Sequence, residues 1–131
     1  MKTKADTIKG WFRKGNSDLA TVKACLKSEC YDTACFHTQQ AAEKYLKGYL
    51  ASIDAESPFT HSLTMLVDIC SRYDVAFREL YDLADLLTPY AITSRYDQDF
   101  WPDIDTVTEA LGASEIIRAF VQDHLPNEFK V

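Results

Sequence analysis

Glycine and proline are scarce in this sequence, with four of each among 131 residues. That content is too low for a disordered or fibrous chain, and the length predicts one domain spanning residues 1–131 with a core of its own. Cations are also few, with 14 Lys and Arg against 20 Asp and Glu. The resulting net charge of −6 excludes a generally basic nucleic-acid binder, although it leaves room for a local basic patch.

Long apolar runs and paired cysteine motifs are missing as well. No stretch approaches the ~18 apolar residues needed to cross a bilayer. The first 14 residues also lack the apolar run that a secretory signal peptide contains. The four cysteines show neither a C-x-x-C pair nor zinc-finger spacing: Cys25, Cys30, Cys35 and Cys70. We therefore predict a cytoplasmic protein with reduced thiols, no membrane contact, no metal site and no cofactor. A disulfide or a metal site is the alternative for the cysteines.

Apolar residues recur at helical spacing through most of the chain, and strand-like alternation is almost absent. Five segments show this spacing: residues 6–29, 32–53, 62–73, 75–87 and 103–124. Residues 94–102 lack periodicity and are predicted to be a loop. The pattern predicts an all-α fold, an antiparallel up-and-down helical bundle of four long helices plus a short helix.

Capping and helix-breaking residues predict where these helices begin and end. Asp32 is a plausible N-cap of the second helix, and Ser62 or Thr60 can cap the third. Pro89 should end or kink the fourth helix. Gly15 is a soft spot at which the first helix could kink.

Large aromatic residues are numerous for so small a bundle: Trp11, Phe36, Tyr45, Phe100, Trp101 and Phe120. Some of them should remain at the surface, where contiguous apolar area usually marks a partner surface. Because closed two-fold dimers are the commonest assemblies, we predict a homodimer.

Residues 34–47 form the string ACFHTQQAAEKYLK, which is followed by THSL at 60–63 and TSRYD at 93–97. Together with Trp11 and the Asp18–Leu19 pair in the first helix, these strings resemble the HEPN family of small all-helical proteins. The resemblance spans nearly the whole chain. It implies an antiparallel bundle of four long helices plus a short one, commonly dimeric and often encoded beside a small nucleotidyltransferase. Such pairs include toxin–antitoxin systems, in which the HEPN partner can be an RNase.

Catalytic members of the family are recognised by an R-x4-6-H motif after the fourth helix, in which Arg stabilises phosphate charge and His transfers protons. This sequence has Arg95, but no His follows at the required distance. Asp97 or Asp99 could act as a base, yet an exposed Asp is ionised at pH 7 and is a poor acid. The sequence therefore favours a protein that is not an enzyme, with a metal-independent RNase that uses Arg95 and a non-standard base as the alternative.

Seven side chains are candidates for ligand binding. Arg95 and its neighbour Tyr96 suit phosphate recognition with base stacking, unless Arg95 pairs with a carboxylate and Tyr96 packs into the bundle. The other five lie at the start of the third helix or along one flank of the second: His61, His37, Gln40, Lys44 and Lys47. The alternative to ligand binding is that the two histidines have a structural role. For the flank of the second helix, the alternative is a solvated face whose side chains contact each other between successive turns.

These features together predict a non-catalytic HEPN-like binding module. It is expected to be a dimer that binds a nucleotide or docks a nucleotidyltransferase partner, as in a toxin–antitoxin-type component. RNA is a disfavoured ligand because Arg95 is surrounded by acidic residues of the fourth helix and the following loop. That surrounding charge weakens binding of a long strand more than binding of one small phosphate.

Overall fold

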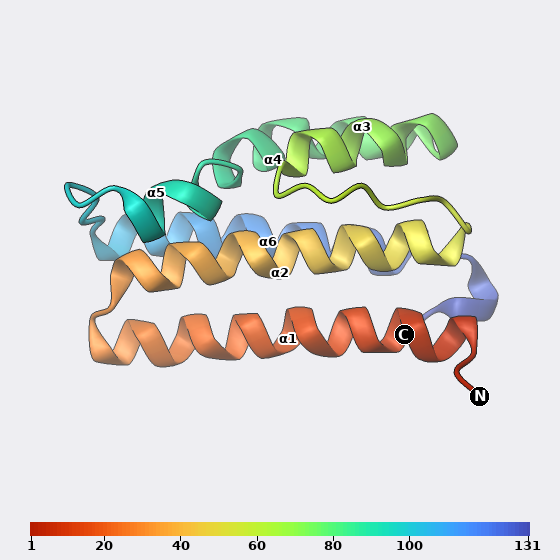
Figure 1. Ribbon diagram of the computed structural model, residues 1–131, viewed down its shortest axis with the longest axis horizontal. Coiled ribbons are helices and arrows are strands. Elements are labelled where there is room, and N and C mark those ends of the chain that lie inside the picture. Colours follow the sequence, from red (N-terminus) through yellow and green to blue (C-terminus); the bar gives the residue numbers. More distant parts are fainter.

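The computed structural model describes all 131 residues, and every regular element in it is helical. Three long helices form the body of the bundle: α1 (Lys4–Ser28), α2 (Tyr31–Ser52) and α6 (Ile104–His124). The shorter elements are α3 (Leu63–Tyr73), the 3-10 helix η1 (Val75–Leu80), α4 (Tyr81–Leu87), α5 (Tyr90–Tyr96) and the 3-10 helix η2 (Asn127–Phe129). In Figure 1, α1 lies along one side, α2 and α6 form the middle, and α3 to α5 cover the other side. The predicted all-α bundle is confirmed.

The α1–α2 pair forms the most extensive contact between helices in the bundle. Gly15 of α1 faces Tyr45 of α2 so closely that a Cβ atom at Gly15 would lie 2.6 Å from Cε1 of that ring. Phe12 packs against the same ring, with 5.1 Å between the ring centres. Ala41 and Ala42 of α2 are fully buried, and their small size allows neighbouring helices to approach α2 closely. The core is therefore centred on α2.

Three predicted boundary features can be compared directly with the structure. The helix α1 runs without interruption across Gly15, where the sequence allowed a kink, and contact with Tyr45 accounts for the glycine. Asp32 is not the N-cap of α2, because Cys30 occupies that position and Asp32 lies in the first turn, where its charge favours the helix dipole. The predicted Ser62 cap is confirmed, since its hydroxyl accepts a hydrogen bond from the Met65 amide at 3.2 Å.

The segment expected to form one fourth helix is divided. Asp74 caps η1, and α-helical geometry begins only at Tyr81. Pro89 follows the end of α4 as predicted, but it also starts α5, so the prediction of a loop is wrong for residues 94–96. Proline lacks an N–H donor, which the first turn of a helix does not need, and its fixed φ suits a helix start.

Two expectations from the sequence concern membrane-spanning segments and the cysteine thiols. None of the helices combines the length and the apolar character that spanning a bilayer requires. The four cysteines are free thiols, of which Cys35 and Cys70 are buried and Cys30 is exposed. Burial raises the pKa of Cys35 and of Cys70 to about 12, so neither thiol ionises near neutral pH.

Candidate functional site

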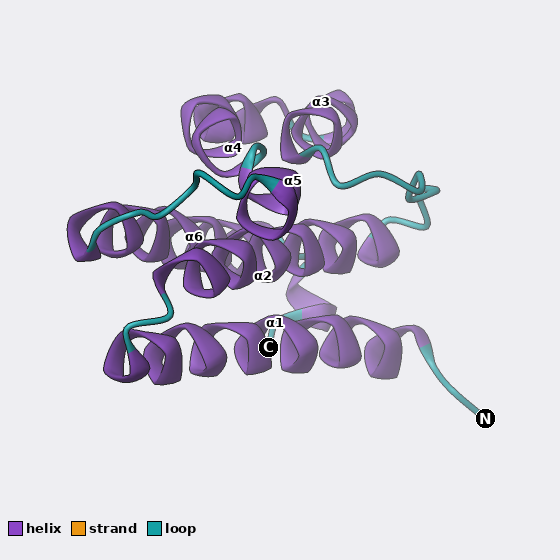
Figure 2. Ribbon diagram, turned by 60° about the vertical axis from the view of Figure 1, so that its left-hand side comes forward, coloured by secondary structure: helices purple, strands orange, loops and turns teal.

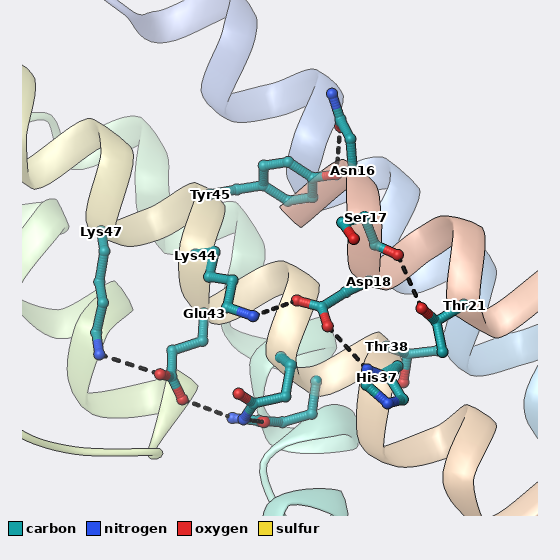
Figure 3. Close-up of polar contacts among 12 residues, drawn as sticks. Asn16, Ser17, Asp18, Thr21, His37, Thr38, Glu43, Lys44, Tyr45 and Lys47 are labelled. Atoms are coloured by element: carbon teal, nitrogen blue, oxygen red, sulfur yellow. Dashed lines mark hydrogen bonds and ion pairs between the residues drawn. The ribbon is translucent and has the colours of Figure 1, made fainter. Parts of the chain in front are cut away.

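A buried carboxylate of α1 organises the first of two polar clusters along α2 (Figure 3). Asp18 is only 7% exposed, and its two oxygens contact different residues of α2. Lys44 donates to Oδ2 at 2.5 Å, and Nδ1 of His37 lies 2.8 Å from Oδ1. His37 and Lys44 are two helical turns apart, so both side chains point toward α1. The cluster joins α1 to α2.

A second buried carboxylate, Glu43, joins α2 to the segment before α3. Its Oε1 accepts a hydrogen bond from Gln39 at 3.2 Å and lies 3.0 Å from Nδ1 of His61, while Lys47 donates to Oε2 at 3.0 Å. Burial raises the pKa of Glu43, but the hydrogen bonds from His61, Lys47 and Gln39 outweigh it, so the pKa falls below its ordinary value. Gln40 extends the cluster by donating to the Gln39 side-chain oxygen at 2.7 Å.

We refer to these two clusters together as the α2 seam, which consists of Asp18, His37, Gln39, Gln40, Glu43, Lys44, Lys47 and His61. The seam contains five of the seven sequence-predicted site residues, and their role in ligand binding stays a prediction. Sequence reasoning missed the importance of Asp18, although a signal was present. The residue lies in the apolar stripe of α1 with Gly15, Leu19 and Val22, all of which are buried. A carboxylate within such a stripe indicates a buried ion pair.

Arg95 lies on α5, where it contacts aromatic rings and forms no ion pair within the chain. Its guanidinium carbon is 4.8 Å from the centre of the Phe36 ring and 4.9 Å from that of Tyr96. Its Nε donates to the Ala91 carbonyl one turn earlier, at 2.9 Å. The alternative in which Arg95 pairs with a carboxylate is therefore not observed, and the terminal guanidinium nitrogens stay available.

Several exposed apolar side chains lie near Arg95. Ile92 is 65% exposed, Tyr96 68% and Trp101 76%. Arg95, Tyr96 and Trp101 also line an open depression of about 450 Å³, together with Asp32, Ser94, Asp97, Gln98 and Phe100. We refer to Ile92, Arg95, Tyr96 and Trp101 as the α5 surface.

The seam and the α5 surface are separate. None of the five seam candidates lines the depression at Arg95. The ring of Phe36 links the two regions, because it contacts Arg95 and its centre lies 5.2 Å from that of the His37 ring. The seven predicted site residues therefore do not surround one hollow.

No histidine lines the depression at Arg95. His37 and His61 contact the carboxylates of the seam, and Nδ1 of His124 lies 2.8 Å from the Phe120 carbonyl, near the end of α6. No group of three His, Cys, Asp or Glu side chains is placed to hold a metal ion. The arrangement around Arg95 is suited to binding by charge and by aromatic contact.

Comparison with known proteins agrees with this architecture. The family model described as HEPN domain matches residues 8–124. The crystal structure of ST0689, an archaeal HEPN homologue, superposes with a TM-score of 0.73 at 21% identity, covering 91% of this chain and 98% of that one. The crystal structure of TT1696 from Thermus thermophilus gives a TM-score of 0.74 at 26% identity, covering 88% and 96%. A search of curated proteins gave no match. Because the family model spans nearly the whole chain, the protein belongs to the HEPN domain family.

Proposed function

We propose that this protein is a non-catalytic HEPN module that docks a protein partner through the α5 surface. The main support is the exposure of Ile92, Tyr96 and Trp101, each more than 60% accessible, beside an Arg95 that has no ion partner. Trp, Tyr and Arg are the residue types that dominate binding energy at protein interfaces. Exposed apolar side chains grouped in this way favour burial against a second protein.

The partner that we propose is a small nucleotidyltransferase. Family resemblance supports this choice, since HEPN proteins are often encoded beside such enzymes. The depression at Arg95 offers a mixed surface for such a partner, with Asp32, Asp97 and Gln98 as a polar rim beside the aromatic rings. A pair of this kind would be a toxin–antitoxin-type system in the cytoplasm.

The chemistry available beside Arg95 supports the non-catalytic part of the proposal. RNA cleavage at that residue would need a group that both accepts and donates a proton near neutral pH. None of the three histidines lines the depression at Arg95, each has Nδ1 in contact with a carboxylate or carbonyl oxygen, and Asp97 and Asp99 are exposed carboxylates. Arg95 alone would bind phosphate without cleaving a bond.

A nucleotide is the second candidate ligand of the same surface. Its support is the pair of rings that flank the Arg95 guanidinium, which would hold the side chain ready for a phosphate while Trp101 offers a stacking face. The depression of about 450 Å³ falls in the usual size range of small-ligand sites.

The predicted homodimer stays part of the proposal. A second apolar hollow, of about 460 Å³, lies between α4 and α6 and includes Leu83, Leu86 and Ile116, the last of which is 55% exposed. Light scattering on the purified protein should give twice the 14.9 kDa chain mass. A mass of one chain at micromolar concentration would contradict the dimer.

Co-expression tests the docking proposal. Tagged protein is produced with the product of the neighbouring reading frame, which we expect to be a nucleotidyltransferase, and co-purification is compared among variants. Tyr96→Ala combined with Trp101→Ala should abolish co-purification, because it removes the two aromatic anchors. Phe59→Ala is the matched control, since Phe59 is fully exposed and lies outside the α5 surface. Equal recovery of the partner with the double variant, or no partner at all, would contradict the proposal.

Calorimetry with ATP and GTP tests the nucleotide candidate. The wild type should release heat on binding, and Arg95→Gln should not, because the phosphate loses its guanidinium. Incubation of the pure protein with tRNA should give no cleavage. Cleavage that Arg95→Ala abolishes would instead favour the RNase alternative.

A further inference from the structure

Charge is distributed unevenly along this chain. Residues 1–28 contain seven of the 14 Lys and Arg but only two of the 20 Asp and Glu, which gives this segment a formal charge of +5. The remaining 103 residues contain seven cations and 18 carboxylates, a formal charge of −11. The net charge of −6 therefore conceals a basic helix on an acidic body.

The fold places this basic helix at the outside of the bundle. Figures 1 and 2 show α1 as an outer layer whose neighbour is α2, with the opposite side open. Its apolar residues face the bundle and are buried, among them Ile8, Phe12 and Leu19. Six exposed cations make up what we refer to as the α1 basic face: Lys2, Lys9, Arg13, Lys14, Lys23 and Lys27.

These six cations have no ion partner within the chain. Lys4 is the one cation of this segment in a salt bridge, with Asp54 at 2.6 Å. Of the two carboxylates in α1, Asp6 is bound to the Thr3 amide in a capping box and Asp18 is buried in the seam. An ordinary solvated helix face alternates acids and bases at successive turns, which stabilises the helix. The α1 basic face has no acidic residues between its cations, so stabilisation of the helix by ion pairs does not explain why the cations are there.

The surface of α1 is hollowed beside these cations. One depression of about 380 Å³ is lined by Gly10, Arg13, Lys14 and Ser17, without any apolar side chain. A second, of about 330 Å³, shares Gly10 and Lys14 with it and reaches Lys2 and Trp11. A Cβ atom at Gly10 would meet no other atom within 4 Å, so the backbone there is open to close approach.

We infer that the α1 basic face binds the phosphate backbone of a nucleic-acid duplex without reading its sequence. From Lys9 to Lys27 the helix rises by ~27 Å, and Lys9 and Arg13 are separated by ~6 Å along its axis. A duplex presents about one negative charge per 1.7 Å of its axis, so cations spread along a helix of this length can meet several phosphates at once. Lysine and arginine contacts to phosphate fix position and do not select bases.

Two other polyanions fit the face less well. Insertion into an acidic membrane requires an exposed apolar side, but the apolar side of α1 is buried against the bundle. A single strand is normally held by a row of stacking aromatic rings, whereas Trp11 is the only aromatic residue that lines either depression. A rigid duplex needs neither feature.

Fluorescence anisotropy with a labelled 20-base-pair duplex, as DNA and as RNA, tests this inference. The wild-type chain should bind at 50 mM salt, with an affinity that falls steeply as salt increases. Replacing Lys9, Arg13 and Lys14 by Gln should weaken binding at least about tenfold and reduce the salt slope by about 2.7, the loss of three phosphate contacts. Gly10→Leu should also weaken binding while keeping every charge, because its side chain would fill the shared hollow.

A matched control separates this face from other cations. Arg72→Gln with Arg78→Gln removes two exposed cations of α3 and η1. This double variant should bind the duplex like the wild type. The inference is overturned if the wild type does not bind either duplex at 50 mM salt. It is also overturned if the Lys9, Arg13 and Lys14 variant binds as tightly as the wild type, or if vesicles with phosphatidylserine bind more tightly than the duplex.

Discussion

The α2 seam and the α5 surface are built from similar polar and aromatic residue types, but their partners differ. In the seam, the carboxylates of Asp18 and Glu43 each contact two or more side chains at 3.2 Å or less. On the α5 surface, Arg95 contacts only rings and its own helix, and Trp101 remains 76% exposed. The charged groups of the α2 seam are paired within the chain, whereas the exposed side chains of the α5 surface are free to contact a partner.

Because of this difference, the residues that identify the family most clearly are not the residues at which we propose binding. The string at residues 34–47 identifies the family, yet its polar members lie in the seam, where buried carboxylates demand charged partners. Residues 92–101, which include the shorter TSRYD string of the same resemblance, contain the exposed anchors. The most recognisable residues of this chain therefore join its helices, and we place partner binding at the α5 surface.

The largest expected effect is at Glu43. Glu43→Ala removes the acceptor of Lys47 and one of the two acceptors of Gln39, which is fully buried and keeps only its donated bond to the His61 carbonyl. We therefore expect a loss of about 3 kcal/mol in the free energy of unfolding. Urea denaturation followed by circular dichroism measures this loss. Glu56→Ala, an exposed Glu in the following loop, is the control and should stay within about 0.5 kcal/mol of the wild type. A similar small change at Glu43 would mean that the seam does not stabilise the bundle.

A smaller loss is expected at Asp18. Asp18→Ala should lower the free energy of unfolding by about 2 kcal/mol, because the freed side chains of Lys44 and His37 are partly exposed and can reach water. Asp97→Ala, beside Arg95, is the contrasting variant and should change stability by less than about 0.5 kcal/mol. The same urea experiment applies. Equal losses of unfolding free energy for Asp18→Ala and Asp97→Ala would contradict the difference between the α2 seam and the α5 surface.

The seam should also make stability depend on acid. The pKa of Glu43 is lowered by folding, so its contribution is present above the ordinary value of 4.5 and is lost as the pH falls below it. The free energy of unfolding of the wild type should therefore decrease more steeply between about pH 5 and pH 3 than that of Glu43→Gln. Glu56→Gln should follow the wild type. Parallel curves for Glu43→Gln and the wild type would contradict the lowered pKa.

The smallest effect on stability is expected at the α5 surface. Tyr96→Ala and Trp101→Ala remove side chains that are mostly exposed, so each should change the free energy of unfolding by less than about 0.5 kcal/mol. Thermal unfolding by circular dichroism provides the comparison with Glu43→Ala. A loss of about 2 kcal/mol or more at Trp101, on the order of a buried-residue deletion, would show that this ring packs into the fold.

The helices and their apolar faces could be predicted from periodicity because burial imposes a 3.6-residue repeat on α1, α2, α3 and α6. The division at Tyr81 and the restart at Pro89 could not, since proline is compatible with both the end and the start of a helix. The absence of a kink at Gly15 depended on Tyr45, a residue of another helix. Local sequence does not contain that contact.

The candidate site was harder to predict than the fold. Sequence spacing placed Gln40, Lys44 and Lys47 on one flank of α2, but the flank became a seam only because carboxylates from other turns and another helix lie beside it. Arg95 and Tyr96 were predicted as a pair, and both line the same depression. The third member, Trp101, is brought there by the loop after α5, whose path depends on tertiary packing.

Calorimetric titration of the nucleotidyltransferase partner into two folded variants tests the central claim most directly, namely that the seam joins helices while the α5 surface binds. Lys44→Gln changes the seam, and Trp101→Ala changes the α5 surface. We predict that Lys44→Gln binds within about twofold of the wild type and that Trp101→Ala binds at least about tenfold more weakly. Weakened binding by Lys44→Gln with unchanged binding by Trp101→Ala would contradict the account.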